Sequence, residues 1–499
     1  MTDLLDHTDD GTPATAAGNP DPRRWLALAV IAVAQLMVVL DASIVNIALP
    51  SAQRALHIST SERQWVITAY TLTFGGFLLL GGRIADYVGR KRMFIIGLLG
   101  FAGSSALGGA ALSGPMLFAS RALQGTFAAI LAPAALSLIT VTFTEVHERA
   151  KAFGVYGAIA GGGAAIGLVM GGVLTEYASW RWCLLVNVPI AIVTAVAGSA
   201  IVRESRAPGN TSYDIPGTVT VTAGLAALVY GFTAAAQDGW SSPTTLGFLA
   251  GAAVLLVAFV SIELRTANPL LPLRVVLDRN RGGAYLASFL VGAGMMGMFL
   301  FLTFYFQGTL GYSALRSGFA FLPFSAGIIV AATVSSRVMP KLGPRPVMAA
   351  GFAVAAAGMA WLTQVGVHTS YLTHVLPAEA MLSLGLGFAF VPMGSTALLG
   401  VGNHDAGVAS ALVNTSQQVG GSLGTALLNT VAASATSAYL ATRVASPATV
   451  AAAQVHGFTV GFWIAAGCLA VATVTVLGVV RASRHDLHEL SAAAVPAAA

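Results

Sequence analysis

Long apolar stretches separated by short polar or Gly/Pro-containing breaks run from Trp25 almost to the end of the chain. A helix needs about 20 apolar residues to cross the hydrocarbon core of a bilayer. About fourteen stretches meet this length, with approximate cores at 26–49, 64–83, 93–113, 116–141, 153–175, 183–202, 216–236, 245–264, 284–307, 317–338, 346–366, 374–399, 407–432 and 457–480. The pattern predicts an all-α polytopic membrane protein with about 14 transmembrane helices.

The composition supports this class. Hydrophobic residues make up 56% of the chain and charged residues 9%, and the 56 glycines are spread through the apolar stretches. Such a balance is typical of helical membrane proteins and not of a large soluble core. Residues 1–24 are polar. They lack the positively charged start, the short apolar core and the cleavage site of a secretory signal, so we expect a disordered cytosolic tail there. A second cytosolic tail is expected at 482–499.

The basic residues indicate the orientation. If residue 1 is cytosolic, nineteen of the 25 Lys and Arg lie on the inner side, and Arg121 lies within a helix. Those left outside are Arg54, Arg63, Arg181, Arg316 and Arg443. This bias follows the positive-inside rule with an even number of spans and both termini cytosolic. It accounts for the basic character without a nucleic-acid partner, because the cations lie in short loops.

An internal repeat connects the two ends of the chain. The turn from Arg83 to Gly89 follows the second span, and the turn from Arg337 to Gly343 follows the tenth; in both, Arg stands six residues before Gly. Any tight cytosolic turn can use Arg and Gly, which is the simpler explanation. The repeat nevertheless predicts two six-helix bundles, at 25–203 and 284–481, with two inserted helices and linkers at 204–283. Two similar halves around a midplane site are typical of alternating-access transporters.

Four motifs carry a family resemblance. Gly-Arg-Ile-Ala-Asp-Tyr-Val-Gly-Arg-Lys-Arg at 82–92 resembles the loop 2–3 signature of the major facilitator superfamily, and Arg-Ala-Leu-Gln-Gly at 121–125 resembles its fourth-helix motif. The run at 41–50 resembles the first-helix signature of its fourteen-helix drug:proton antiporters. The antiporter motif of the fifth helix is matched by the spacing of Gly154, Gly163, Gly167, Gly171 and Gly172. Tyr87 stands where the loop signature usually has Arg, and Leu168 where the antiporter motif usually has Pro.

The resemblance implies a major facilitator fold and assigns roles to these motifs. A cytosolic gate is implied for Gly82, Asp86, Gly89, Arg90 and Arg92, with Asp86 helping to hold the outward-facing state closed on the inside. A carboxylate and a guanidinium at neighbouring helix ends suit such a contact, although a solvated turn that only sets topology is the alternative. The fifth-span glycines allow another helix to approach closely. The resemblance implies that they form the interface between the halves.

Asp41 is the first candidate for proton coupling. A charge at bilayer depth costs roughly 2.5 to 3.5 kcal/mol on insertion scales, so an acid there suggests a functional site. Asp41 lies roughly 12 Å below the outer end of the first span, and Arg121 roughly 8 Å below the same surface in the fourth. We therefore expect that they can meet, and that movement separating them would change the affinity of Asp41 for a proton. The alternatives are a purely structural acid, and an Arg121 bonded only to carbonyls and Gln124.

Glu379 is the second candidate acid, near the outer end of the twelfth span. If that helix begins at Thr373, Glu379 is intramembrane and predicted to function in proton coupling. If it begins after Pro377, Glu379 is simply a favourable first-turn acid.

Two spans offer a candidate substrate surface. Met295, Phe299 and Tyr305 in the ninth span belong to a methionine- and aromatic-rich run that suits bulky apolar ligands. The alternative is that this run faces lipid or a neighbouring helix. In the thirteenth span, Asn414 and Gln418 share a helix face beside Gln417, and these groups either contact a ligand or join helices.

Several chemistries lack support. The chain has no phosphate-binding Gly-x-x-x-x-Gly-Lys-Ser/Thr loop, its two cysteines are far apart, and its nine histidines show no metal-ligand spacing. We therefore expect no metal, no cofactor beyond the proton and no enzymatic activity. The sequence predicts a monomeric, proton-coupled exporter of hydrophobic compounds, cationic ones among the candidates, in a bacterial plasma membrane. The alternatives are an exporter of a metabolite, a siderophore or a self-made antibiotic and, from another class, a membrane-embedded enzyme or sensor.

Overall fold

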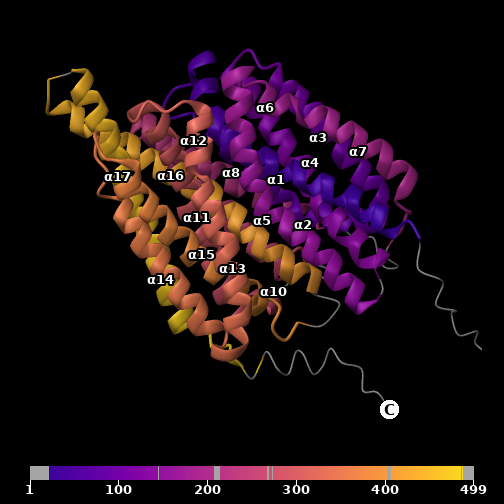
Figure 1. Cartoon of the computed structure of the whole chain (residues 1–499). Coiled ribbons are helices and arrows are strands. Elements are labelled where there is room, and N and C mark those ends of the chain that lie inside the picture. The colour runs from indigo at the N-terminus through magenta and orange to yellow at the C-terminus, as the bar shows by residue number, and fades with distance from the viewer. Residues whose placement is uncertain are drawn as a thin grey trace, which may run out of the picture.

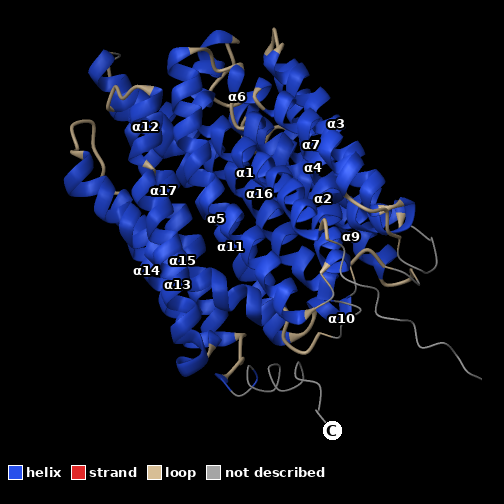
Figure 2. Cartoon of the chain, turned by 45° about the vertical axis from the view of Figure 1, so that its right-hand side comes forward, coloured by secondary structure: helices blue, strands red, loops and turns tan. Residues whose placement is uncertain are grey.

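The computed structural model describes residues 22–143, 145–206, 214–266, 269–271, 273–401, 406–444, 446–484 and 486. Among these residues the regular structure is helical and no strand occurs (Figure 2). Most of the two predicted tails, and part of the linkers between 204 and 283, lie outside the described residues. The expectation of an all-α chain is confirmed.

The helices of the first half follow the predicted stretches in order. They are α1 (Arg24–Ala55), α2 (Trp65–Val88), α3 (Arg90–Gly109), α4 (Gly114–Thr142), α5 (Val146–Tyr177), and the pair α6 (Trp182–Leu185) and α7 (Asn187–Ile201). The inserted segment forms α8 (Ile215–Asp238), α9 (Pro243–Glu263) and the short α10 (Leu273–Val276).

The second half contains two helices that begin or end in a π-helical turn. Its elements are α11 (Arg279–Phe304) with η1 (Tyr305–Thr309), α12 (Ala314–Ala320), α13 (Leu322–Leu342), α14 (Pro344–Leu362), η2 (Tyr371–Val375) with α15 (Leu376–Ala397), α16 (Ala406–Ala441) and α17 (Pro447–Gly478). Proline stands in the first turn of α4, α8, α9, α14 and α17, where its missing N–H would have had no partner in the helix.

Every one of the fourteen predicted stretches falls on a helix. Among the described residues, eleven helical segments are long and apolar enough to cross a membrane, and twelve if the bent α2 counts as one span. The chain is therefore a multi-pass membrane protein. Because α5 and α16 do not add to this number, the count of 14 crossings stays a prediction, as do the boundaries assigned to the bundles.

The two halves share one pattern of helix neighbours. In the first half α1 packs on α5 and α7, α2 on α4, and α3 on α4 and α7. In the second, α11 packs on α16 and α17, α13 on α15, and α14 on α15 and α17. The second pattern is obtained from the first when each span is replaced by the span eight positions later in the chain. Figure 1 shows the two halves side by side. The repeated turns agree, because Gly89 and Gly343 both adopt positive φ, at 130° and 86°.

The most extensive packing between the halves joins α2 to α16 and α5 to α12 and α13, and α1 makes smaller contacts with α11 and α12. The inserted α8 packs against both α2 and α16, whereas α9 packs on α8. Leu72, Leu225, Val229 and Ala426 form a small buried cluster where α2, α8 and α16 meet. The inserted hairpin therefore lies along one seam between the bundles.

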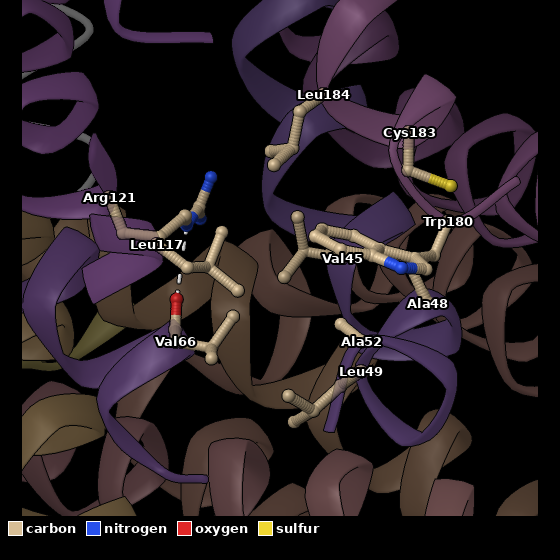
Figure 3. Close-up of a pocket in the computed structure, with 10 residues that line it drawn as sticks. All are labelled: Val45, Ala48, Leu49, Ala52, Val66, Leu117, Arg121, Trp180, Cys183 and Leu184. Atoms are coloured by element: carbon tan, nitrogen blue, oxygen red, sulfur yellow. Dashed lines mark hydrogen bonds between the residues drawn. The ribbon is translucent and has the colours of Figure 1, made fainter. Parts of the chain in front are cut away.

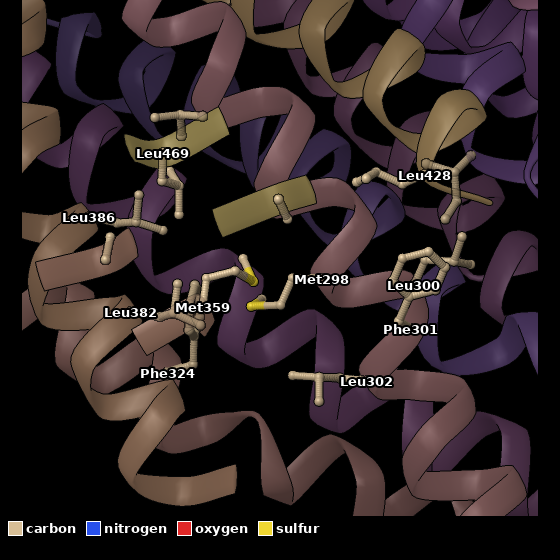
Figure 4. Packing of buried hydrophobic residues seen from close by; sticks show 14 of the residues in the cluster. Met298, Leu300, Phe301, Leu302, Phe324, Met359, Leu382, Leu386, Leu428 and Leu469 are labelled. Atoms are coloured by element: carbon tan, nitrogen blue, oxygen red, sulfur yellow. The ribbon is translucent and has the colours of Figure 1, made fainter. Parts of the chain in front are cut away.

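The interior of the second half is packed with many alanines and with larger Leu, Phe and Met side chains. Figure 4 shows Met298 and Phe301 of α11 among side chains that include Met359, Leu382 and Leu386. Helix association in lipid depends on close packing and not on exclusion of water. Gly385 illustrates this, because a Cβ there would lie 2.5 Å from the backbone of α14.

Candidate functional site

A buried ion pair lies inside the first bundle. Asp41 is 0% exposed and Arg121 2% exposed, and Arg121 Nη1 lies 2.6 Å from Asp41 Oδ2. The other carboxyl oxygen, Oδ1, accepts hydrogen bonds from Gln124 Nε2 at 3.0 Å and Asn187 Nδ2 at 2.8 Å. Helices α1, α4 and α7 thus meet at one carboxylate, and Asp41 contacts Arg121 as the sequence led us to expect.

Arg121 is held by more than its ion pair. Its Nε donates to the Val66 carbonyl at 3.0 Å, its Nη1 donates to Gln124 Oε1 at 2.7 Å, and its guanidinium lies 4.4 Å from the centre of the Tyr70 ring. Arg121 also borders a cavity about the size of one water molecule (Figure 3). The other residues lining this cavity are apolar, so only dispersion contacts hold that side of the guanidinium.

Sequence reasoning missed three members of this cluster: Asn187, Tyr70 and Ser105. Ser105 Oγ accepts from Gln124 Nε2 at 2.7 Å and so orients the amide that bonds to Asp41. Asn187 carried a usable signal, because it is an uncharged polar residue inside the apolar stretch 183–202. The others are common inside helices and gave none.

Asp41 is surrounded by hydrogen-bond donors. Three donors face its two oxygen atoms, and one of them is a cation. Removing one partner of a buried ion pair costs about 3 to 5 kcal/mol, because the remaining charge is left without compensation. The pair is therefore costly to break while α1 and α4 keep their present arrangement.

Glu379 is buried in the opposite half without a cation among its described contacts. The π-helical η2 begins at Tyr371 and continues into α15, so Glu379 lies eight residues inside one helical segment and is 0% exposed. The structure thus favours the intramembrane alternative over a first-turn acid. Oε1 has no hydrogen-bond partner among the described residues. The Tyr371 hydroxyl donates to the Ala320 carbonyl at 2.7 Å and lies 3.4 Å from Glu379 Oε2, to which it is a long-range donor. Glu379 therefore has one weak donor and no cation among the described residues around it.

The seam between the halves is closed at the side predicted to be outer. Arg63 Nε donates to Asn429 Oδ1 at 3.1 Å, and its guanidinium lies 3.9 Å from the centre of the Phe304 ring. Burial lowers the pKa of Arg63 to about 9, so it stays cationic at neutral pH. Four more hydrogen bonds cross between the halves here, joining Asn429 to Thr60, Thr71 to Ser422, Gln307 to Ile47 and Leu315 to Glu176.

The predicted gate residues gather at the end of the first bundle that is predicted to be cytosolic. Asp86 at the end of α2 pairs with Arg90 at the start of α3, with 2.7 Å between Oδ1 and Nε. Gly89 between them adopts a φ of 130°. Gly82 faces Pro133 of α4, because a Cβ at this glycine would lie 3.3 Å from it. The pair bridges neighbouring helix ends as expected, while its role as a gate stays a prediction.

Glu204 also belongs to this turn, although the sequence analysis did not identify it. Its carboxylate accepts the backbone N–H groups of Lys91 at 3.0 Å and Arg92 at 3.1 Å, so it caps α3 from the segment after the sixth span. A Cβ on Gly89 would come within 2.8 Å of that carboxylate. Arg92 therefore contributes its backbone to this turn, and its side chain is exposed.

Comparison with known proteins defines the family. The sequence model of the Major Facilitator Superfamily matches residues 31–425. The chain belongs to the major facilitator superfamily. A puromycin resistance protein of Streptomyces alboniger is 50% identical over 97% of this chain and 96% of its own length. A cephamycin export protein of Amycolatopsis lactamdurans is 40% identical over 90% and 91%, and a multidrug efflux pump of Mycolicibacterium smegmatis is 31% identical over 85% and 83%.

Solved structures agree on the fold. A bacterial homologue of the human lysosomal transporter Spinster, in an inward-facing and unoccupied conformation, has a TM-score of 0.63 at 14% identity and covers 92% of this chain and 98% of its own. A POT family transporter has a TM-score of 0.65 at 15% identity, covering 91% and 97%. At this identity the likeness shows a shared fold and no shared substrate.

The antiporter-motif glycines of this major facilitator protein divide between two interfaces. A Cβ on Gly163, Gly167 or Gly171 would meet α1 of the same half, at 3.0, 2.8 and 2.9 Å. Gly172 faces α12 of the other half, where a Cβ would lie 2.6 Å from Leu315. Gly154 lies on α5, and its surroundings fall outside the described residues. The expectation that this set lines the interface between halves is therefore wrong for the first three, because their four-residue spacing turns them toward α1.

Leu168 does not interrupt α5. A leucine keeps the backbone N–H that a proline would lack, and the helix runs through it to Tyr177. The Leu168 carbonyl instead faces α12, where a Cβ on Gly318 would lie 2.5 Å from it.

The substrate candidates are scattered over different environments. Tyr305 is 0% exposed and donates to the Gly366 carbonyl at 2.8 Å, so it serves packing. Phe299 packs against Phe321 and Phe324, with ring centres 5.4 and 5.2 Å apart, and Met295 is half-buried at the edge of the same core. The structure therefore favours helix packing for these three over a ligand surface.

The polar candidates on α16 differ from one another. Asn414 is exposed, Gln417 is half-buried, and Gln418 lies at the seam, with its Cβ 3.1 Å from the position of a Cβ on Gly75 of α2. Their role in binding stays a prediction.

Proposed function

We propose that this major facilitator protein exports drugs or antibiotics across the bacterial plasma membrane in exchange for protons, with both termini in the cytosol. Export is supported by relatives of nearly full length that are named for antibiotic resistance and export. The observation that carries proton coupling is the buried pair Asp41 and Arg121, whose oxygen and nitrogen lie 2.6 Å apart in a cluster closed to solvent.

Coupling follows from the cost of breaking this pair. A proton that binds Asp41 cancels the charge facing Arg121, and the guanidinium then moves toward the Val66 carbonyl, the Tyr70 ring and the small cavity beside it. Because Asp41 sits on α1 and Arg121 on α4, the exchange of partners shifts two helices of one bundle. We assign this shift to the switch between outward- and inward-facing states.

Glu379 provides a second proton-binding acid in the other bundle. A buried carboxyl without a cation favours binding a proton, whereas Asp41 faces a guanidinium, so we assign the two acids to different steps of the cycle. One proton entering down a 100 mV potential releases about 2.3 kcal/mol. At about 1.4 kcal/mol per tenfold, this sustains a substrate gradient of roughly fiftyfold per charge.

The substrate is proposed to be a hydrophobic drug or antibiotic, cationic ones included. A self-made antibiotic is compatible with the same site and belongs to the same class. The α16 face bearing Asn414, Gln417 and Gln418 is the candidate surface for its polar groups.

The test is substrate-driven proton release in inverted vesicles containing the full chain, with puromycin and a panel of antibiotics and dyes. We expect release with at least one compound in wild type and in Asp238→Asn, which removes an exposed acid at the end of α8. We expect none in Asp41→Asn or Arg121→Ala at equal amounts of folded protein. Uphill export by both variants would remove the pair from the mechanism, and proton-independent export by wild type would refute antiport.

A further inference from the structure

Two buried carboxyl groups face each other at the cytosolic base of the inserted hairpin. Asp214 precedes α8 and Glu263 is the last residue of α9, and their exposed fractions are 3% and 4%. Because α8 and α9 are consecutive helices that pack on each other, the start of α8 and the end of α9 lie at the same end of the hairpin, and the two carboxyl groups interact there. They come from neither bundle and are not part of the efflux site described above.

In each acid, one carboxyl oxygen accepts a hydrogen bond and the other has no donor among the described residues. Asp214 Oδ1 accepts the Gly217 N–H at 2.9 Å, and Glu263 Oε2 accepts the Leu271 N–H at 2.9 Å. Asp214 Oδ2 and Glu263 Oε1 are buried and have no donor among the described residues. Gly217 leaves the space that this arrangement needs, since a Cβ there would lie 2.3 Å from Asp214 Oδ2.

Two carboxylates cannot both stay ionised at this separation in a buried site, because their charges repel and neither has a donor to offer the other. One shared proton satisfies both orphan oxygens at once. We propose that Asp214 and Glu263 form a carboxylic acid–carboxylate pair that binds one cytosolic proton and makes the anchoring of the inserted hairpin on α2 depend on cytosolic pH.

The surrounding charges do not replace that proton. The segments packed around the pair carry Arg83 at the end of α2, Arg265 after α9 and Arg274 on α10. Arg265 and Arg274 are exposed, and Arg83 directs its Nη2 to the Pro269 carbonyl at 2.5 Å. None of the described residues donates a hydrogen bond to Asp214 Oδ2 or to Glu263 Oε1.

The same contacts connect the pair to the gate end of α2. Glu263 accepts a hydrogen bond from the Leu271 N–H, and Arg83 donates one to the Pro269 carbonyl in the same short segment. Loss of the shared proton sets two negative charges against each other, pushes the α8 and α9 ends apart and weakens the hold on residues 269–271. Because α8 packs on both α2 and α16, this loosening reaches the seam between the bundles.

The first experiment follows the proton itself, in the full chain in lipid nanodiscs without substrate. Infrared difference spectra are recorded as pH is raised. We expect wild type to lose one protonated-carboxyl band that is absent from both Asp214→Asn and Glu263→Gln, since an amide N–H replaces the shared proton. Asp238→Asn should keep it. A wild-type spectrum without this band, or a band that persists in both amide variants, would overturn the pair.

The second experiment measures how firmly the base of the inserted hairpin is attached to the gate end of α2. Spin labels at the exposed positions 92 and 265 report the distance between the gate turn and the hairpin base. We expect this distance to lengthen with rising pH in wild type and Asp238→Asn and to stay constant in the two amide variants. A pH-independent distance in wild type would overturn the link to the gate. Neither readout requires transport, so failure here is distinguishable from failure of the proposed efflux.

Discussion

At the scale of single residues, the protein places the same chemical group in contrasting surroundings. Asp41 receives a guanidinium and two amide donors, whereas Glu379 has one oxygen without a donor among the described residues and one weak donor, the Tyr371 hydroxyl. The environment of an acid, and not its residue type alone, governs its affinity for a proton. The two acids can therefore act at different points of one cycle.

Asn187→Leu should test the support of Asp41. The change removes a 2.8 Å hydrogen bond to a buried carboxylate while keeping a side chain that branches at Cγ. A hydrogen bond to a charged group is worth about 1.5 to 3 kcal/mol, so we expect a clear loss of thermal stability and slower export with the ion pair intact. The measurement is thermal unfolding and initial export rate; unchanged values would show that Gln124 and Arg121 suffice.

Gly89→Ala should destabilise the gate turn by about 2 kcal/mol. A φ of 130° is almost restricted to glycine, and the new Cβ would displace the Glu204 carboxylate that caps α3. Gly103→Ala on α3 is the matched control, because a Cβ there meets nothing within 4 Å. Thermal unfolding of both variants measures the difference, and equal stability would contradict the close approach of Glu204.

At the scale of elements, small residues decide which helices meet. On α5, Gly163, Gly167 and Gly171 let α1 pack closely within one bundle, and Gly172 admits α12 of the other bundle one position later. A shift of one residue turns a helix by about 100°, which is enough to change the partner. One helix thus belongs to a rigid bundle on one face and to a moving seam on the next.

Gly318→Val should prevent closure of the α5–α12 seam. Its Cβ would lie 2.5 Å from the Leu168 carbonyl, and backbone cannot yield as a flexible side chain does. We expect weaker cross-linking between cysteines introduced at 176 and 315, where Glu176 now bonds to the Leu315 N–H. Gly308→Ala, in open space at the same end of the protein, should cross-link like the parent; equal yields in both variants would refute the tight seam.

At the scale of the whole molecule, two equivalent bundles are closed against each other at one end. Arg63 contributes a buried cation that is held by Asn429 and the Phe304 ring in the opposite bundle. Such contacts are lost when the seam opens, so they set the balance between the two states.

Asn429→Ala should shift the protein toward the outward-open state. It removes the Arg63 contact and the hydrogen bond to the Thr60 carbonyl. A loss of about 1.5 to 3 kcal/mol corresponds to a shift of roughly ten- to a hundredfold in the equilibrium. Distances between spin labels at exposed positions 54 and 443 should lengthen, while Gln364→Ala, at an exposed amide, should leave them unchanged. A closed distribution in Asn429→Ala would contradict the role of Arg63.

The sequence by itself determined the class, the helices and the approximate depth of the charged residues. Hydrophobicity of about 20 residues is a local property, so each predicted stretch could be found on a helix, and the Arg-to-Gly turn repeat could be read without coordinates. Depth follows from the helical rise, which is why Asp41 and Arg121 could be expected to meet.

Only the tertiary structure decided which side chains share a neighbour. The partnership of Asp41 with Asn187, of Glu204 with the α3 N-terminus and of Asp214 with Glu263 joins residues from separate helices or loops. The rotation of each helix about its axis determined that three motif glycines face α1 and that Tyr305 serves packing. Hydropathy is nearly uniform around a membrane helix, so it carries little information about that rotation; close packing between helices fixes it.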